Sequence, residues 1–214
     1  MEKDYLLIID TPSVKKYVFG TDKLKEIRGA SAILAYLNRD LTERYLENII
    51  GAAKVKGIYA NGGSGQFILN GVSEDDVVKC GESLKKLYAD GTRESGHILY
   101  GYSPIDEDYK NASEIAHFNL NREKEKGHTV HICHTPYSKD CESCSSNSAS
   151  NALIENGEKI WLCQVCYNKR KPEKNPLFGN ENIQLKVWKE FGNYLKKEGL
   201  TDKKWFELRP PDFE

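Results

Sequence analysis

Two different hydrophobic periods alternate along the first fifty residues. Residues 4–10, DYLLIID, form an unbroken apolar run, which is typical of a strand that is covered on both faces. Residues 23–50 repeat apolar side chains at steps of three and four, which predicts one amphipathic helix, or two helices with a break near Asp40. Between them, VKKYVFG at 14–20 is rich in strand-favouring side chains, so we expect it to extend the first strand beyond Pro12.

The next fifty residues predict two strands, a helix and a further strand. The strands at 53–62 and 64–71 meet at a glycine-rich turn, and SEDDVVKCGESLKKLYADG at 73–91 has the opening of a capped helix. A last apolar run at 96–105 predicts a strand that is ended by Pro104. This β-α-β-β-α-β order predicts an α+β fold of the ferredoxin-like type. We expect the first and third strands at the centre, with the glycine turn beside the end of the first strand.

The composition changes after about residue 105, where polar and charged residues replace the regular periods. We therefore expect three parts: a ferredoxin-like domain at 1–105, a zinc-binding subdomain at 106–180, and an amphipathic helix with a linker at 181–214. The apolar side chains of that helix recur at steps of four: Ile183, Val187, Phe191 and Leu195.

Two CxxC pairs are the most specific motif in the chain: Cys141, Cys144, Cys163 and Cys166. Each pair presents two thiolates from one tight turn, and Zn²⁺ prefers four such soft ligands in a tetrahedron. A site with four protein ligands has no open position, so we expect a structural zinc ion. Disulfides or redox thiols are the alternatives, although a thioredoxin-like motif needs one CxxC rather than two. His128, His131 and His134 suggest either a second metal site or a polar loop.

Charge excludes a strong general attraction to nucleic acid. The 31 Lys and Arg residues nearly balance the 32 Asp and Glu residues, so any phosphate contact has to be local. One basic cluster could provide RNA contacts, although a solvated face is the more common role of such a cluster; it consists of Lys169, Arg170, Lys171 and Lys174. No run approaches the length of a membrane span, and no signal peptide is evident, so we expect a cytoplasmic protein without membrane contacts.

The glycine turn stands where a nucleotide-polymerising enzyme of this fold type would carry carboxylates. Two-metal phosphoryl transfer needs acids on neighbouring strands. Asp10 ends the first strand, but the turn at 62–65 reads Gly-Gly-Ser-Gly and offers no carboxylate. We therefore assign no catalytic residue. The glycines either let backbone N–H groups approach a phosphate or serve only as a hairpin turn.

Two stretches carry a family resemblance: IIDTPSVKKYVFGTDKLKEIRGASAILAYLN at 8–38 and YANGGSGQFIL at 59–69. With the CxxC pairs, they resemble the first palm and zinc module of the large polymerase/cyclase subunit of type III CRISPR effector complexes, including stand-alone relatives without the nuclease domain. In that family two palms hold two ATP molecules between them. The second palm makes cyclic oligoadenylates with a Gly-Gly-Asp-Asp turn, and the first palm has a degenerate turn.

The resemblance implies a set of nucleotide-binding residues: Asp10, Thr11, Ser13, Gly29, Ala30, Ser31, Gly62, Gly63 and Ser64. The residues from Asp10 to Ser13 would border the triphosphate, and the Ser31 hydroxyl would donate to the nucleotide. Structural alternatives remain for each. Gly29 and Ala30 would allow a helix to pack closely on the sheet, Ser31 would bond within its own helix, and Asp10 would cap a turn.

The resemblance also implies partners. ATP and Mg²⁺ would bind only with a second palm in the same or another chain, other CRISPR effector subunits would be partners, and antiviral defence would be the context. This chain alone would be inactive, as a fragment or as a natural half. One alternative is a zinc-stabilised scaffold that binds a protein or RNA. Another is a homodimeric cyclase, which would need acidic residues to bind the metal ions. The candidates Glu74, Asp75 and Asp76 are better explained as first-turn acids that complement the helix dipole.

Overall fold

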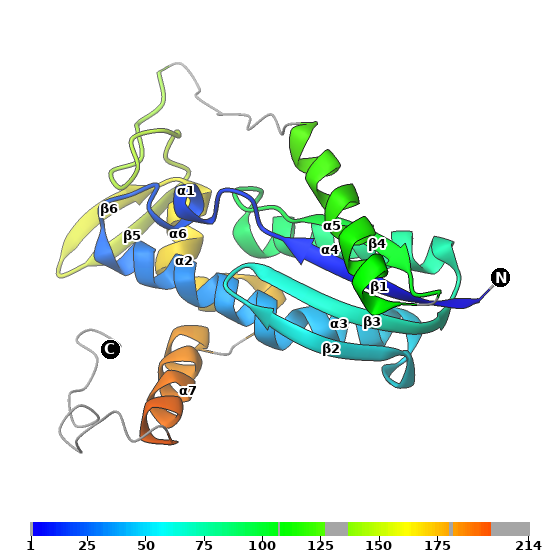
Figure 1. The fold of residues 1–214 in the computed structure, drawn as a ribbon. Helices are drawn as coiled ribbons and strands as arrows, with labels where there is room; N and C mark the ends of the chain where they lie inside the picture. Colours follow the sequence, from blue (N-terminus) through cyan, green and yellow to red (C-terminus); the bar gives the residue numbers. More distant parts are fainter. Residues whose placement is uncertain (1, 107, 127–136, 180–181, 198–214) are drawn as a thin grey trace.

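A four-stranded antiparallel sheet forms the centre of the molecule in the computed structural model, which describes residues 2–106, 108–126, 137–179 and 182–197 (Figure 1). The strand order is β2-β3-β1-β4, so the first and third strands are central, as we predicted. All three neighbouring pairs are antiparallel. The strands are β1 (Lys3–Asp10), β2 (Val55–Asn61), β3 (Ser64–Val72) and β4 (Leu99–Pro104).

Helices cover both faces of this sheet, which explains the unbroken apolar run of β1. Leu7 and Ile9 face a large core under α2 (Leu24–Tyr36), α3 (Thr42–Ile50) and α4 (Glu74–Thr92). Leu6 and Ile8 face α5 (Tyr109–Glu125) on the opposite side. Successive side chains of a strand point to opposite faces, so both faces need apolar residues here. Helix α4 begins with the predicted capping box between Ser73 and Asp76.

The helical segment predicted at 23–50 is interrupted near Asp40, which agrees with the second of the two alternatives that we considered. Residues Leu37–Leu41 form a π-helical turn between α2 and α3. The Thr42 hydroxyl donates to the Leu37 carbonyl at 2.8 Å, and the Asn38 amide lies 3.2 Å from the Tyr88 hydroxyl. These buried polar contacts stabilise the wider turn, so the two helices continue into each other without a loop.

The prediction that residues 14–20 extend the first strand is wrong. Residues Val14–Val18 form a short helix, α1, after Ser13 at φ 64°. Val14, Tyr17 and Val18 stand at i, i+3 and i+4, which is a helical spacing, and they pack together beside α2. Strand propensity was therefore outweighed by the period of the apolar positions.

The second half of the chain adds a small two-stranded sheet and further helices. Helix α5 lies within residues 106–180, which we grouped with the cysteines, yet it packs on β4 and β1. None of the described helices is long and apolar enough to cross a bilayer. The remaining elements are a 3-10 turn Ala52–Lys54, β5 (Asn151–Glu155), β6 (Glu158–Leu162), α6 (Gln164–Arg170), the 3-10 turns Pro172–Lys174 and Pro176–Phe178, and α7 (Ile183–Lys197).

Candidate metal centre and nucleotide-binding turn

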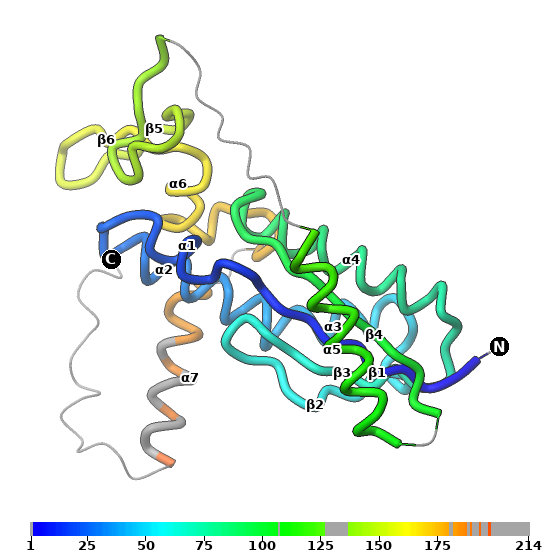
Figure 2. The backbone as a smooth tube through the Cα atoms, turned by 45° about the horizontal axis from the view of Figure 1, so that its top comes forward, coloured from blue at the N-terminus to red at the C-terminus, as the bar shows by residue number. Residues whose placement is uncertain are grey.

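The side chains of the four predicted cysteines converge on one point. They belong to the part of the chain around β5, β6 and α6, which lies at one end of the molecule (Figure 2). Their sulfur atoms all lie within 4.8 Å of one another, and the Sγ atoms of Cys144 and Cys163 are 3.9 Å apart. All four thiols are free, so the disulfide alternative is wrong. The three histidines considered as a second site lie outside the described residues.

Short turns hold the cysteines in place. The Cys141 N–H donates to Asn147 at 2.9 Å, and the Ser145 N–H donates back to the Cys141 carbonyl at 3.0 Å, which closes the first turn. Cys163 caps α6, where its Sγ accepts from the Cys166 N–H at 3.4 Å. The β5–β6 hairpin carries the chain from the first pair to the second.

The electrostatics of the cluster favour a bound cation. Contacts with Cys163 and Cys166 lower the pKa of the Cys141 thiol, whereas contact with Cys141 raises the pKa of Cys163 to about 11. These opposite shifts indicate that the thiols do not all lose their protons together, because four thiolates at this separation repel one another. A divalent cation at the centre would remove that repulsion, and tetrahedral Zn²⁺ with Zn–S bonds of about 2.3 Å places sulfurs about 3.8 Å apart.

Half of the predicted basic cluster does not lie on the surface. Lys169 is 3% exposed, and the Arg170 side chain is 9% exposed. Arg170 pairs with the fully buried Glu26 at 2.9 Å and with Glu155 at 3.3 Å. The expectation of a solvated basic face is wrong for these two residues, because the Arg170 side chain faces α2 and the Lys169 side chain faces α1. Lys171 is half-buried, and the remaining member of the cluster is exposed.

The glycine turn lies beside the end of β1, as predicted. Asp10 is opposite Ser64 in the sheet register, and the Thr11 N–H donates to the Gly63 carbonyl at 2.7 Å. Gly63 has φ 90°, and a Cβ added to it would lie 2.9 Å from the Val14 side chain and 3.3 Å from that of Thr11. Glycine is therefore needed here both for its backbone conformation and for the close approach of the 11–14 segment.

The polar groups beside this turn differ in how well they are paired. Thr11 is 4% exposed, and its hydroxyl has no hydrogen-bond partner among the described residues. Asp10 forms an ion pair of 2.8 Å with Lys124 of α5, a partner that sequence reasoning missed because the two residues are far apart in the chain. The Thr11 hydroxyl, which lacks a partner, and the Lys124 ammonium group therefore lie beside a turn without carboxylates.

The predicted nucleotide contacts on α2 interact with other parts of the chain. A Cβ on Gly29 would lie 1.6 Å from the Lys169 carbonyl oxygen, so the close contact is with helix α6 and not with the sheet. Ala30 is fully buried beside α1. The Ser31 hydroxyl donates to the Ile27 carbonyl at 3.0 Å within its own helix. The structure thus places Asp10, Thr11, Gly63 and Ser64 together and fills the space next to Gly29 and Ala30 with protein.

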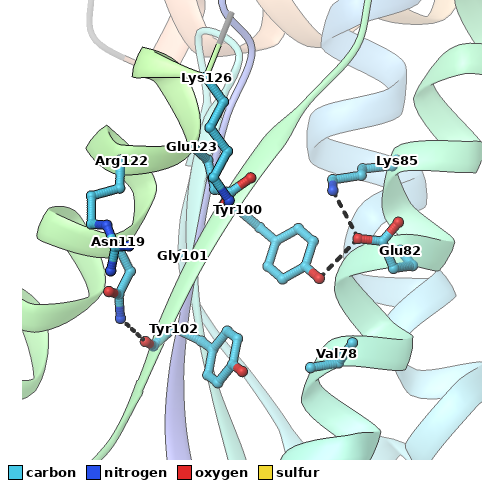
Figure 3. Close-up of a pocket in the computed structure, with 10 residues that line it drawn as sticks. All are labelled: Val78, Glu82, Lys85, Tyr100, Gly101, Tyr102, Asn119, Arg122, Glu123 and Lys126. Atoms are coloured by element: carbon cyan, nitrogen blue, oxygen red, sulfur yellow. Dashed lines mark hydrogen bonds and ion pairs between the residues drawn. The ribbon is translucent and has the colours of Figure 1, made fainter.

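An open groove of about 430 Å³ lies along the outer edge of β4, between α4 and α5 (Figure 3). Glu82 accepts from the Tyr100 hydroxyl at 2.9 Å and from Lys85 at 2.7 Å, and burial together with Glu82 raises the pKa of Tyr100. Asn119 donates to the Tyr102 carbonyl at 3.1 Å, which occupies part of the strand edge. None of the nucleotide contacts predicted from the sequence lines this groove.

Comparisons with known proteins show a likeness of fold. No family model and no curated protein sequence matches the chain. Among solved structures, a chain of a Csm1–Csm4 cassette in complex with cA3 matches with a TM-score of 0.51 and 13% identity over 63% of this chain. A cassette with one ATP matches with a TM-score of 0.50 and 12% identity over 64%. The Csm1–Csm4 subcomplex of the type III-A CRISPR-Csm interference complex matches with 0.51 and 14% over 67%.

The matched parts make up only 22 to 23% of those solved chains, so this chain corresponds to about a fifth of their length. At these identities the likeness establishes a shared fold. The resemblance inferred from the sequence is confirmed to that extent, because the solved chains come from type III CRISPR-Csm cassettes.

Proposed function

We propose that this chain is the non-catalytic first palm and zinc module of a type III CRISPR-like enzyme that makes cyclic oligoadenylates from ATP. In this proposal residues 1–105 are a ferredoxin-like palm with a degenerate turn, residues 106–180 belong to the zinc module, and residues 181–214 lead toward a second palm. The chain supplies half of an ATP pocket and works in the cytoplasm, in antiviral defence and with other effector subunits.

One observation carries this proposal: the carboxyl-free turn meets the loop that follows β1. Thr11 donates to Gly63, and its buried hydroxyl points to no partner in the described part of the chain. The similar cassettes are in complex with ATP or cA3, which supports a nucleotide-binding role for this chain. In the proposed pocket the glycines let the phosphates approach the backbone, and the Thr11 hydroxyl donates to a phosphate oxygen.

In this proposal the second palm carries out the chemistry, because the turn at residues 62–65 offers no carboxylate. Asp10 is the carboxylate at the end of β1, and it is paired with Lys124. A two-metal site needs at least one further acid from the neighbouring turn. A Gly-Gly-Asp-Asp turn in the second palm would therefore hold Mg²⁺ and promote transfer. For this chain we infer orientation of the nucleotide and no catalytic residue.

The four cysteines fit a structural zinc ion. They supply four soft ligands at tetrahedral spacing, and Cys141, Cys163 and Cys166 are buried. Such a closed site contributes folding free energy and has no open position for a substrate.

The test is a calorimetric titration with ATP and Mg²⁺ of the metal-loaded chain, alone and joined to the second palm. We expect binding in the joined protein and at least tenfold weaker binding by the chain alone, since half of the contacts are missing. Gly63→Ala should weaken binding, because its Cβ displaces Thr11 or Val14. Gly71→Ala is the matched control, because Gly71 also has a positive φ and nothing within 4 Å of an added Cβ, and it lies at the other end of β3, away from the turn.

A zinc-stabilised scaffold is the second candidate function. Exposed apolar side chains on α5 favour a protein partner, since Phe118 is 63% exposed and Ile115 is 42% exposed. Two buried members of the basic cluster weaken the case for RNA. If neither protein in the calorimetric test binds ATP, the scaffold becomes the better account. A salt titration of RNA binding by a Lys171→Glu, Lys174→Glu variant would then separate RNA from protein partners.

A further inference from the structure

Helix α6 carries metal ligands on its first turn and buried anchors on its second. Cys163 caps the helix and Cys166 lies in its first turn, so metal binding would hold the N-terminal end of α6. Asn168, Lys169 and Arg170 follow, and they connect α6 to the sheet domain. Asn168 donates to the Gly91 carbonyl of α4 at 3.0 Å, which fixes α4 to the same short helix.

Lys169 makes the contact that leads toward the glycine turn. Its ammonium group is buried, donates to the Tyr17 carbonyl of α1, and lies 4.4 Å from the centre of the Tyr17 ring. A buried ammonium is costly without such partners, so Lys169 has few alternative positions. The contact joins two segments that are 152 residues apart in the chain.

Helix α1 passes this constraint to the loop beside the glycine turn. The Tyr17 N–H donates to the Ser13 carbonyl at 3.0 Å, and Ser13 directly follows the segment that bonds Gly63 through Thr11. Ser13 itself has φ 64°, a conformation that a serine adopts only when its surroundings hold it there. A continuous series of contacts therefore runs from Cys166 through Lys169 and Tyr17 to the Gly63 carbonyl.

The seat of α6 on α2 has little room for intermediate positions. The space next to Gly29 is filled by the Lys169 carbonyl, and the fully buried Glu26 pairs with Arg170. A partial displacement of α6 would leave Glu26 as a buried, unpaired charge, which is strongly unfavourable. The helix is thus either seated on α2 or released from it, as coupling between two sites requires.

We propose that Lys169 is a positioning residue that couples metal occupancy of the four-cysteine cluster to the conformation of residues 11–18. Metal loading seats α6, and Lys169 then fixes α1 and the loop before it. Because coupling is reciprocal, a nucleotide on that loop also strengthens metal retention. Only this last consequence rests on the proposed function; the coupling of metal and loop does not require a nucleotide.

The experiment is hydrogen exchange of the complete chain, metal-loaded and after treatment with a chelator, read on peptides that cover residues 11–20 and β3. In the wild type, metal removal should speed exchange of residues 14–18 by about tenfold, a typical size for coupled sites, while β3 stays protected. Lys169→Met should retain the metal, since no cysteine changes, and yet show the fast exchange when loaded.

Two matched variants separate positioning from general destabilisation. Lys171→Met removes a half-buried ammonium from the end of the same helix and should behave as the wild type. Tyr17→Phe removes a buried hydroxyl that has no partner among the described residues, but it keeps the ring and the carbonyl, so it should preserve the coupling.

Unchanged exchange of residues 11–20 after metal removal from the wild type would overturn the proposal, even if Lys169→Met failed to fold. So would a loaded Lys169→Met protein with wild-type exchange. Coupled exchange without any ATP binding by the two-palm protein would refute the proposed function and leave the coupling intact. Equal ATP affinity with and without the metal would refute the reciprocal consequence only.

Discussion

The cysteine cluster and the central sheet are held together by different means. The sheet has apolar side chains on both faces, with Leu6, Leu7 and Ile9 fully buried between helices. The four-cysteine region has a two-stranded hairpin, and its hydrophobic cluster consists of three buried cysteines and Leu162 with a few half-buried neighbours. Such a small core cannot offset the entropy of ordering its loops. The comparison indicates that burial stabilises the sheet domain, whereas the cysteine region needs a further source of stability, which a metal ion held by the four cysteines would supply.

Metal removal should have the largest effect and should separate the two regions. Structural zinc contributes on the order of 10 kcal/mol in small zinc-binding peptides, so chelation or Cys166→Ser should unfold residues 137–170. The β1 and β3 amides should remain protected from exchange. Acid should have the same effect as chelation, because protons compete with the metal for the thiolates as the pH falls. Metal analysis and hydrogen exchange measure both results, and loss of protection in β1 together with the hairpin would contradict the separation.

Arg170→Met tests the connection between the two regions. Breaking a buried ion pair costs about 3–5 kcal/mol, because the other charge is left buried, and here Glu26 would lose its buried partner. Thermal or urea unfolding measures this loss. The double variant Arg170→Met, Glu26→Leu should recover most of it, since no fully buried charge then remains and Glu155 keeps Lys25 as a partner. Equal destabilisation of the single and double variants would show that packing on Gly29, and not the ion pair, joins the regions.

Leu7→Ala should destabilise the sheet domain and spare the cysteine region, the opposite of what metal removal should do. Deleting a fully buried leucine between the sheet and its helices should cost about 2–5 kcal/mol of unfolding free energy. Metal content should stay at one ion per chain, since the change lies outside the cysteine region. Urea unfolding and metal analysis on the same sample provide the two readouts. A variant that loses its metal under native conditions would mean that the cysteine region depends on the sheet core.

Lys124→Ala should have the smallest effect on stability. The Lys124–Asp10 pair is partly exposed, and such pairs contribute about 0–1 kcal/mol. Its removal frees Asp10, so we expect little change in the unfolding midpoint but weaker ATP binding by the two-palm protein, because a cation beside the turn is lost. Lys126→Ala on the same helix is the control, since Lys126 pairs with Glu123 instead. Equal losses in both variants would point to general charge and not to position.

The parts that could be predicted from the sequence depend on local chemistry. Two CxxC pairs identify their own ligand set, and the long apolar run of β1 predicts a strand that is buried on both faces. The error at α1 has the same origin, because a five-residue segment satisfies strand propensity and helical spacing at once. The position of the glycine turn beside the end of β1 could be predicted as well, because it follows from the strand order.

The missed residues all act across long separations in the chain. Lys124 reaches Asp10 from α5, and Lys169 reaches Tyr17 from α6. Sequence reasoning assigned Lys169 and Arg170 to a basic surface because a run of cations is usually solvated. Their burial is evident only from the structure, in which α6 packs on Gly29. From the sequence, Gly29 could have served either helix packing or nucleotide binding. The tertiary contacts of Gly29, which are with α6, could not be read from the local sequence.

The central claim is that the glycine turn and the loop after β1 form half of an ATP pocket. Photoaffinity labelling of the metal-loaded two-palm protein with an azido analogue of ATP, followed by peptide mapping, tests it most directly. We predict that label appears on peptides containing residues 10–13 or 62–64, that excess ATP prevents it, and that Gly63→Ala reduces it while Gly71→Ala does not. Label confined to the second palm, or unaffected by ATP, would contradict the account.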